Sequence, residues 1–126
     1  MTRRALKPRD ITACALALAE VTEEEPFAPG VSVYKVAGKM FAILHPGDDV
    51  VTVTLKCEPS LALELRAQYE AVTPGYHTNK KHWNTVVLDG SVPADEVLEM
   101  VRHAYDRVVA GLPRQTRERL ALRNGS

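Results

Sequence analysis

The fold is decided by residues 31–56, which read VSVYKVAGKMFAILHPGDDVVTVTLK. Apolar and polar residues alternate here, most cleanly at 50–56, and a period of two is typical of a β-strand that packs one face on a core. Two short segments rich in turn-forming residues, Ala37-Gly38 and the Pro-Gly-Asp-Asp of 46–49, divide the stretch into three runs. The stretch therefore predicts three antiparallel strands in a meander, with one face against a core and the other free.

Helical periodicity flanks these strands on both sides. The expected helices lie near 10–20, followed by an acidic tail from Glu20 to Glu25, at about 59–70, from Pro93 to Gly111, and in a short arginine-rich segment that ends near Leu122. A fourth strand is expected at 84–88, before the turn at 89–91. This order predicts an α+β domain in which an antiparallel β-sheet carries its helices on one face.

Size and composition indicate a single globular domain over residues 1–126. The chain has 126 residues, of which 45% are hydrophobic and 25% charged, as in ordinary globular proteins. No apolar run approaches the roughly 20 residues that cross a bilayer, and the N-terminus shows no signal-like cleavage site. We expect a cytoplasmic protein with no membrane partner, favoured as a monomer, in which Cys14 and Cys57 form no disulfide framework.

The formal net charge of zero hides an uneven distribution. Residues 1–9 carry four basic groups and no acid, and residues 114–126 carry four arginines against one glutamate, so the termini are basic and the body is acidic. An acidic body is unusual for a nucleic-acid binder, because neutralised phosphates supply much of its affinity. One window, 71–88, contains two lysines and two histidines and no carboxylate. Any anion site is expected there.

The irregular segment 71–83 is the most informative part of the chain, because a loop of this length without periodicity is usually functional or packs on itself. Its end combines hydrogen-bond donors, cations and a large aromatic ring, which suits phosphate contacts and stacking. The candidate binding residues are His77, Asn79, Lys80, Lys81, His82, Trp83 and Asn84, together with Lys39 at the hairpin tip and Lys56 at a strand end. The alternative is that Trp83 anchors the loop on the core, that the amides satisfy loop backbone groups, and that the lysines are solvated.

Metal binding and catalysis find little support in the residues. His77 and His82 lack a nearby thiol or carboxylate to complete a tetrahedral set, and Glu23 to Glu25 are adjacent acids that normally point apart. Cys57 has no convincing histidine partner, and no phosphate-binding glycine loop or nucleophile motif occurs. We expect no catalytic residue, no metal and no cofactor.

Four segments resemble the MmcQ/YjbR family: PGVSVYKVAGKMFA from Pro29, the Leu-Lys-Cys of 55–57, TPGYHTNKKHWNTV from Thr73, and AGLPR from Ala110. The similarity covers about residues 10–115. It implies a CyaY-like α+β fold and DNA binding through a double-wing arrangement in which the strand-turn lysines make contacts. It does not imply iron binding, because function belongs to sites and not to folds.

These observations leave two hypotheses of function. The first is a small non-enzymatic module that binds DNA through the 77–84 loop, the strand-turn lysines and the basic ends. The second is a module that binds a small anionic metabolite or a protein partner in a pocket formed by the same loop, which the acidic body favours.

Overall fold

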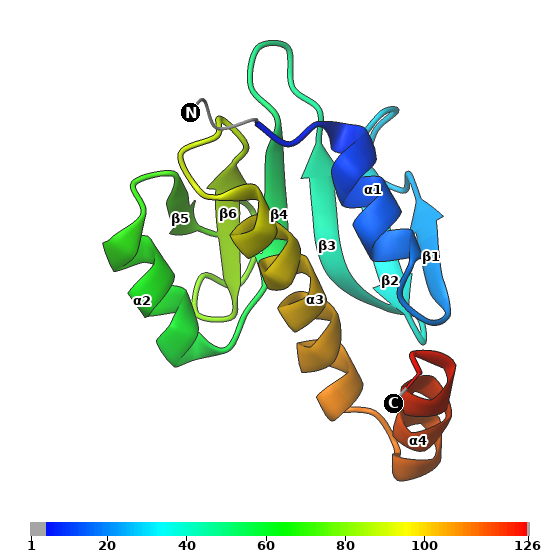
Figure 1. The fold of residues 1–126 in the computed structure, drawn as a ribbon. Coiled ribbons are helices and arrows are strands. Elements are labelled where there is room, and N and C mark those ends of the chain that lie inside the picture. Colours follow the sequence, from blue (N-terminus) through cyan, green and yellow to red (C-terminus); the bar gives the residue numbers. More distant parts are fainter. Residues whose placement is uncertain (1–4, 126) are drawn as a thin grey trace.

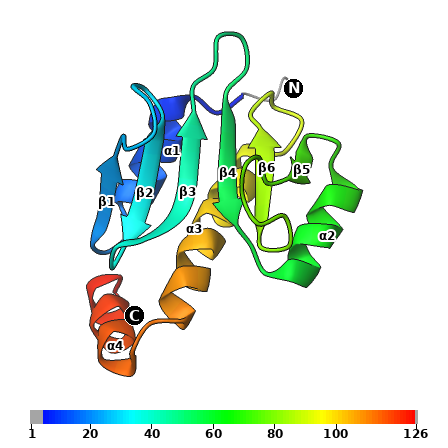
Figure 2. The ribbon, with the colours of Figure 1, turned by 180° about the vertical axis from the view of Figure 1, so that it is seen from behind.

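A computed structural model describes residues 5–125 of the chain. The described residues form one six-stranded antiparallel sheet with the strand order β1-β2-β3-β4-β6-β5 (Figures 1 and 2). The strands are β1 (Val21–Glu24), β2 (Ser32–Val36), β3 (Lys39–His45), β4 (Thr52–Lys56), β5 (Val72–Pro74) and β6 (Trp83–Val87). The helices are α1 (Pro8–Leu16), α2 (Pro59–Gln68), α3 (Ala94–Ala110) and α4 (Arg114–Arg123).

Three helices cover one face of the sheet, and α4 lies beyond the end of α3 (Figure 1). The apolar stripe of α3 is buried along its length, from Val97 to Val108. Its Tyr105 ring meets the ring of Phe41 on β3 edge to face, with centroids 5.7 Å apart. The prediction of an α+β fold with an antiparallel sheet and helices on one face is confirmed. No helix among residues 5–125 is long and apolar enough to cross a membrane.

The opposite face of the sheet carries no helix (Figure 2), yet its central residues are buried. Val33, Ile43, Thr54 and Thr85 are paired across four strands and are between 0% and 8% exposed. The segment 75–82 contributes to this cover: the backbone N–H of Tyr76 donates to Thr85 Oγ1 at 3.0 Å. The hydroxyls of Thr54 and Thr85 hydrogen bond to each other beneath it at 2.8 Å. We call this side the helix-free face.

The N-terminal part of the prediction needs correction. The first helix ends at Leu16, and the residues expected as its acidic tail instead form the edge strand β1. Glu20 adopts a left-handed backbone (φ 60°), which turns the chain into this strand. Glu23 on β1 accepts a hydrogen bond from the Tyr34 hydroxyl at 2.6 Å, so the acids are partly used in strand pairing. The meander therefore has four strands, not three.

A second correction concerns the segment predicted to be irregular. It contains the three-residue strand β5, which pairs with β6 at the other edge of the sheet. Pro74 lies at the end of this strand, as expected for proline at a sheet edge. Of the basic N-terminus, residues 1–4 lie outside the described residues.

Candidate nucleic-acid interface

The predicted lysines come from three separate segments, and the sheet brings these segments to one end. Lys56 ends β4 and pairs with Trp83, which begins β6, while the Cys57 N–H donates to the His82 carbonyl at 2.8 Å. Lys39 begins β3, which is antiparallel to β4, so the start of β3 lies at the same end. We call Lys39, Lys56, Lys80, Lys81 and His82 the basic end of the sheet; it lies at the lower end of the strands in Figure 2.

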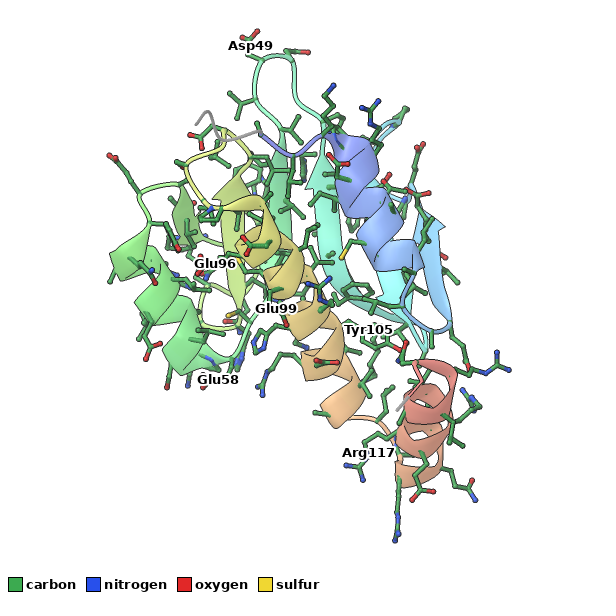
Figure 3. The ribbon with its side chains drawn as sticks, in the orientation of Figure 1. Asp49, Glu58, Glu96, Glu99, Tyr105 and Arg117 are labelled. Atoms are coloured by element: carbon green, nitrogen blue, oxygen red, sulfur yellow. The ribbon has the colours of Figure 1, made fainter. Side chains whose placement is uncertain are left out.

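Acidic residues lie at the opposite end of the same strands. Asp48 and Asp49 occupy the connection between β3 and β4, where Figure 3 labels Asp49, and Asp89 follows β6. Because neighbouring strands alternate in direction, both connections lie at the end away from Lys39 and Lys56. These acidic turns lie opposite Lys39 and Lys56, while Glu58 at the basic end uses its carboxylate oxygens to accept the N–H groups of Ser60 and Leu61.

None of the four lysines at the basic end has a carboxylate partner within residues 5–125. Lys39 and Lys81 are exposed and Lys56 is half-buried. Lys35, by contrast, pairs with Glu24 at 2.7 Å on the helix-free face. Lys80 is partly occupied, since its ammonium donates to the Gly75 carbonyl at 3.1 Å. The basic end therefore offers cations that the described fold does not neutralise.

Arg66 on α2 fixes the loop that carries Lys80 and Lys81. Its Nε donates to Asn84 Oδ1 at 2.7 Å, and its Nη2 donates to the Trp83 carbonyl at 3.2 Å and to the Lys80 carbonyl. One guanidinium thus joins a helix, a strand and the loop. Sequence reasoning did not single out Arg66, because nothing in its spacing on α2 marks it as a loop anchor.

Two predicted site residues, Trp83 and Asn84, need correction because they are buried, and a third, Asn79, is exposed but uses its side-chain oxygen within the loop. Trp83 is 8% exposed and lies on the helix-free face. Gly75 packs closely against it, since a Cβ added to Gly75 would lie only 2.6 Å from the Cβ of Trp83. Asn84 is 2% exposed and donates from Nδ2 to the Ala62 carbonyl at 3.3 Å. Asn79 accepts the Lys81 N–H on Oδ1 at 3.0 Å, which closes a turn of the loop. Trp83 is therefore no stacking platform, as the core-anchoring alternative predicts.

His77 belongs to the helix-free face and not to the basic end. It has a left-handed backbone (φ 55°), and its ring lies 3.9 Å from that of Tyr76. The Tyr76 ring in turn meets His45, at the far end of β3 from Lys39, with centroids 6.5 Å apart. Tyr76 is 62% exposed and is an accessible aromatic residue that the sequence analysis did not identify.

A cleft of about 250 Å³ lies on the helix side of the sheet, between α2 and α3. Residues 75–82 line neither this cleft nor the one between α1, α3 and α4, but two of the predicted site residues, Asn84 from the 77–84 loop and Lys56, border the cleft between α2 and α3. Cys57 and His103 both border the cleft between α2 and α3. Burial raises the pKa of the Cys57 thiol to about 11, so the thiol is protonated at neutral pH. Within residues 5–125 no three His, Cys, Asp or Glu side chains are placed to share a metal ion.

His103 is held as a neutral imidazole. Burial, followed by the charge of Arg107, lowers its pKa, and its Nε2 accepts the Glu58 backbone N–H at 3.1 Å. An imidazole that accepts on Nε2 carries its proton on Nδ1 when neutral. His103 is thus a hydrogen-bond donor at the border of the cleft.

A family model described as YjbR matches residues 16–107 of the chain. An uncharacterised protein of Escherichia coli K12, YjbR, is 40% identical over 86 residues, which is 68% of this chain and 73% of that protein. The uncharacterised YbdF of Escherichia coli O157:H7 is 30% identical over 95 residues, 75% of this chain and 78% of that protein.

Two solved structures have a similar fold. The crystal structure of Deinococcus radiodurans protein DR2400, described by the domain name DUF419, has a TM-score of 0.85 at 34% identity and covers 91% of this chain and 88% of its own. A crystal structure of a Pseudomonas syringae protein has a TM-score of 0.71 at 25% identity, over 81% of this chain and 98% of its own.

Proposed function

This chain belongs to the YjbR family, and from that premise we propose that it is a small non-enzymatic module that binds DNA through the basic end of its sheet. The observation that carries the proposal is the convergence of Lys39, Lys56 and Lys81 from three segments without a carboxylate partner among residues 5–125. Cations that are not neutralised internally are available to neutralise phosphates.

The proposed contacts are to the phosphate backbone and not to bases. Lysine ammonium groups bind phosphate oxygens as point charges and carry no sequence information by themselves. Trp83 and Asn84, the residues best suited to bases, are buried. We therefore expect weak binding that depends strongly on salt and little on sequence, with the acidic turns directed away from the duplex.

The experiment measures binding of a 20-base-pair duplex by fluorescence anisotropy between about 50 and 200 mM salt. In the test variant Lys56→Gln and Lys81→Gln are combined; in the control, Lys7→Gln and Arg9→Gln remove the same charge from exposed positions at the start of α1, away from the basic end. Each lost phosphate contact lowers the salt slope by about 0.9, so the test variant should lose about 1.8 and the control little. Equal slopes for the two double variants, or no binding by the unmodified protein at about 50 mM salt, would refute the proposal.

A further inference from the structure

The cleft between α2 and α3 has an apolar interior. Its floor is formed by Leu55 and Val86 of the sheet, and its walls by Leu61 and Leu65 of α2 and Met100 of α3. The two helices pack over neighbouring parts of the sheet but diverge, and Figure 3 shows Glu96 and Glu99 beside the space between them. An apolar interior with a few polar groups at its border is the usual form of a small-molecule site.

The size of the cleft limits what it can hold. An engineered apolar cavity of about 150 Å³ binds benzene, and this cleft is about 250 Å³. One six-membered ring with a short side chain fills such a volume, and a larger ligand would extend beyond the cleft into solvent. The cleft is therefore suited to a ligand of about ten non-hydrogen atoms.

The charge at the border of the cleft is negative. Glu96, Glu99 and the neutral His103 follow one another on one side of α3. Glu99 is paired with Arg102 at 2.9 Å, but no cation within residues 5–125 pairs with Glu96, which accepts a hydrogen bond from the Tyr69 hydroxyl. Glu96 is thus a half-buried carboxylate beside an apolar surface, with a neutral partner.

Nearby cations do not compensate for this charge. Lys56 borders the cleft, but side chains alternate along a strand, and since Leu55 faces the helices Lys56 faces the helix-free side with its partner Trp83. Arg66 donates from Nε to Asn84 Oδ1 and from Nη2 to the Trp83 carbonyl, so its charge is directed to those groups. Glu58 uses its carboxylate to accept the N–H groups of Ser60 and Leu61 at the start of α2.

We propose that the cleft between α2 and α3 binds a small primary amine with an apolar ring or alkyl body, the body on Leu55, Leu65 and Val86 and the ammonium group at Glu96. The Tyr69 hydroxyl orients the carboxylate from the α2 side. The Lys56 side chain faces away from the cleft that this residue borders, so the proposal does not rest on the proposed DNA binding.

The test compares three probes with the same ring and different head groups: 2-phenylethylamine, 2-phenylethanol and phenylacetate. Each is titrated to about 10 mM into the full-length ¹⁵N- and methyl-labelled protein, because fragments of this size bind at about millimolar affinity. We expect saturable shifts of the methyl signals of the cleft, with the amine bound about fivefold more tightly than the alcohol and phenylacetate weakest. No saturable shift in the cleft, equal affinities, or a preference for phenylacetate overturns the proposal.

Two variants locate the site. Glu96→Gln removes the charge while retaining the shape and should abolish the preference for the amine, whereas Asp95→Asn, one position away and exposed, should preserve it. Leu61→Trp should fill the cleft and block all three probes. If the tryptophan variant does not fold, the pair at 95 and 96 still decides, since an amine preference that survives Glu96→Gln excludes the proposed anchor.

Discussion

Substitution of Arg66 by methionine tests the anchor between α2 and the basic end. Methionine retains most of the apolar stem and removes every donor. The Trp83 carbonyl keeps the Gly75 N–H at 2.9 Å, and the exposed Lys80 carbonyl can bind water, so neither loss costs much. Asn84 Oδ1 is different, because the residue is 2% exposed and Arg66 is the partner that the structure gives this oxygen.

The magnitude follows from that one buried acceptor. An unsatisfied buried polar group costs about 1–3 kcal/mol, so we expect Arg66→Met to lower the free energy of unfolding by about 2 kcal/mol. In a domain of this size that corresponds to a fall in Tm of roughly 6–10 °C. Chemical unfolding in urea measures the first value and calorimetry the second.

A double-mutant cycle separates this explanation from a general loss of packing. Asn84→Leu combined with Arg66→Met removes both partners. The free energy of unfolding lost in the double variant should therefore be smaller than the sum of the two single losses by about 1 kcal/mol or more. Arg114→Met is the control: the structure pairs this exposed arginine with Glu118 one helical turn away, and its loss should change stability by less than about 0.5 kcal/mol. A loss at Arg66 no larger than the control, or strict additivity in the cycle, refutes the reasoning.

Three further outcomes are expected. Thr85→Val leaves the Thr54 hydroxyl and the Tyr76 N–H without their partner, and should lower the free energy of unfolding in urea by about 2 kcal/mol. Adding Thr54→Val should recover part of this loss, and full additivity of the two losses would contradict the shared hydrogen bond. Gly75→Ala places a Cβ 2.6 Å from the Cβ of Trp83 and should shift the tryptophan fluorescence and cost more than about 1 kcal/mol, whereas an unchanged spectrum and stability would show that the loop yields freely. The N–H groups of Ser60 and Leu61 lower the pKa of Glu58, so its contribution to stability is present above the unfolded pKa of about 4.3 and is lost as pH falls through the lower folded pKa. Glu58→Gln should therefore flatten the dependence of unfolding free energy on pH in that acid range. Parallel pH profiles of the variant and the unmodified protein would show that Glu58 does not stabilise the start of α2.

Most of the architecture could be predicted because its signals are local. The alternation at 31–56, the turn residues between its runs and the apolar stripe of α3 each depend on neighbours within a few positions. The two strands that were missed lack such signals. β1 is exposed and rich in glutamate, and β5 has only three residues, so both depend on pairing with a neighbouring strand and not on their own pattern.

The candidate site was predicted less completely, because exposure is a property of the tertiary fold. The composition of 71–88 shows lysines and no acids, and the prediction of an anion site there rests on it; strand pairing explains why Lys39 and Lys56 lie at the same end of the sheet. The burial of Trp83 and Asn84 depends on Arg66 and on the loop folding over the sheet, and neither contact leaves a periodic trace in the sequence. The cleft between α2 and α3 depends on how far two helices diverge, which spacing alone does not encode.

The two edges of the sheet have a consequence for solubility. β1 carries adjacent glutamates on one margin, and β5 on the other is a single short segment that ends in proline. Exposed strand margins act as templates on which further chains assemble, and like charges, brevity and proline each oppose such addition. Concentrated solutions of the native protein should therefore resist fibre-like growth, and Glu23 and Glu24 are the positions at which neutral β-branched residues would remove that protection.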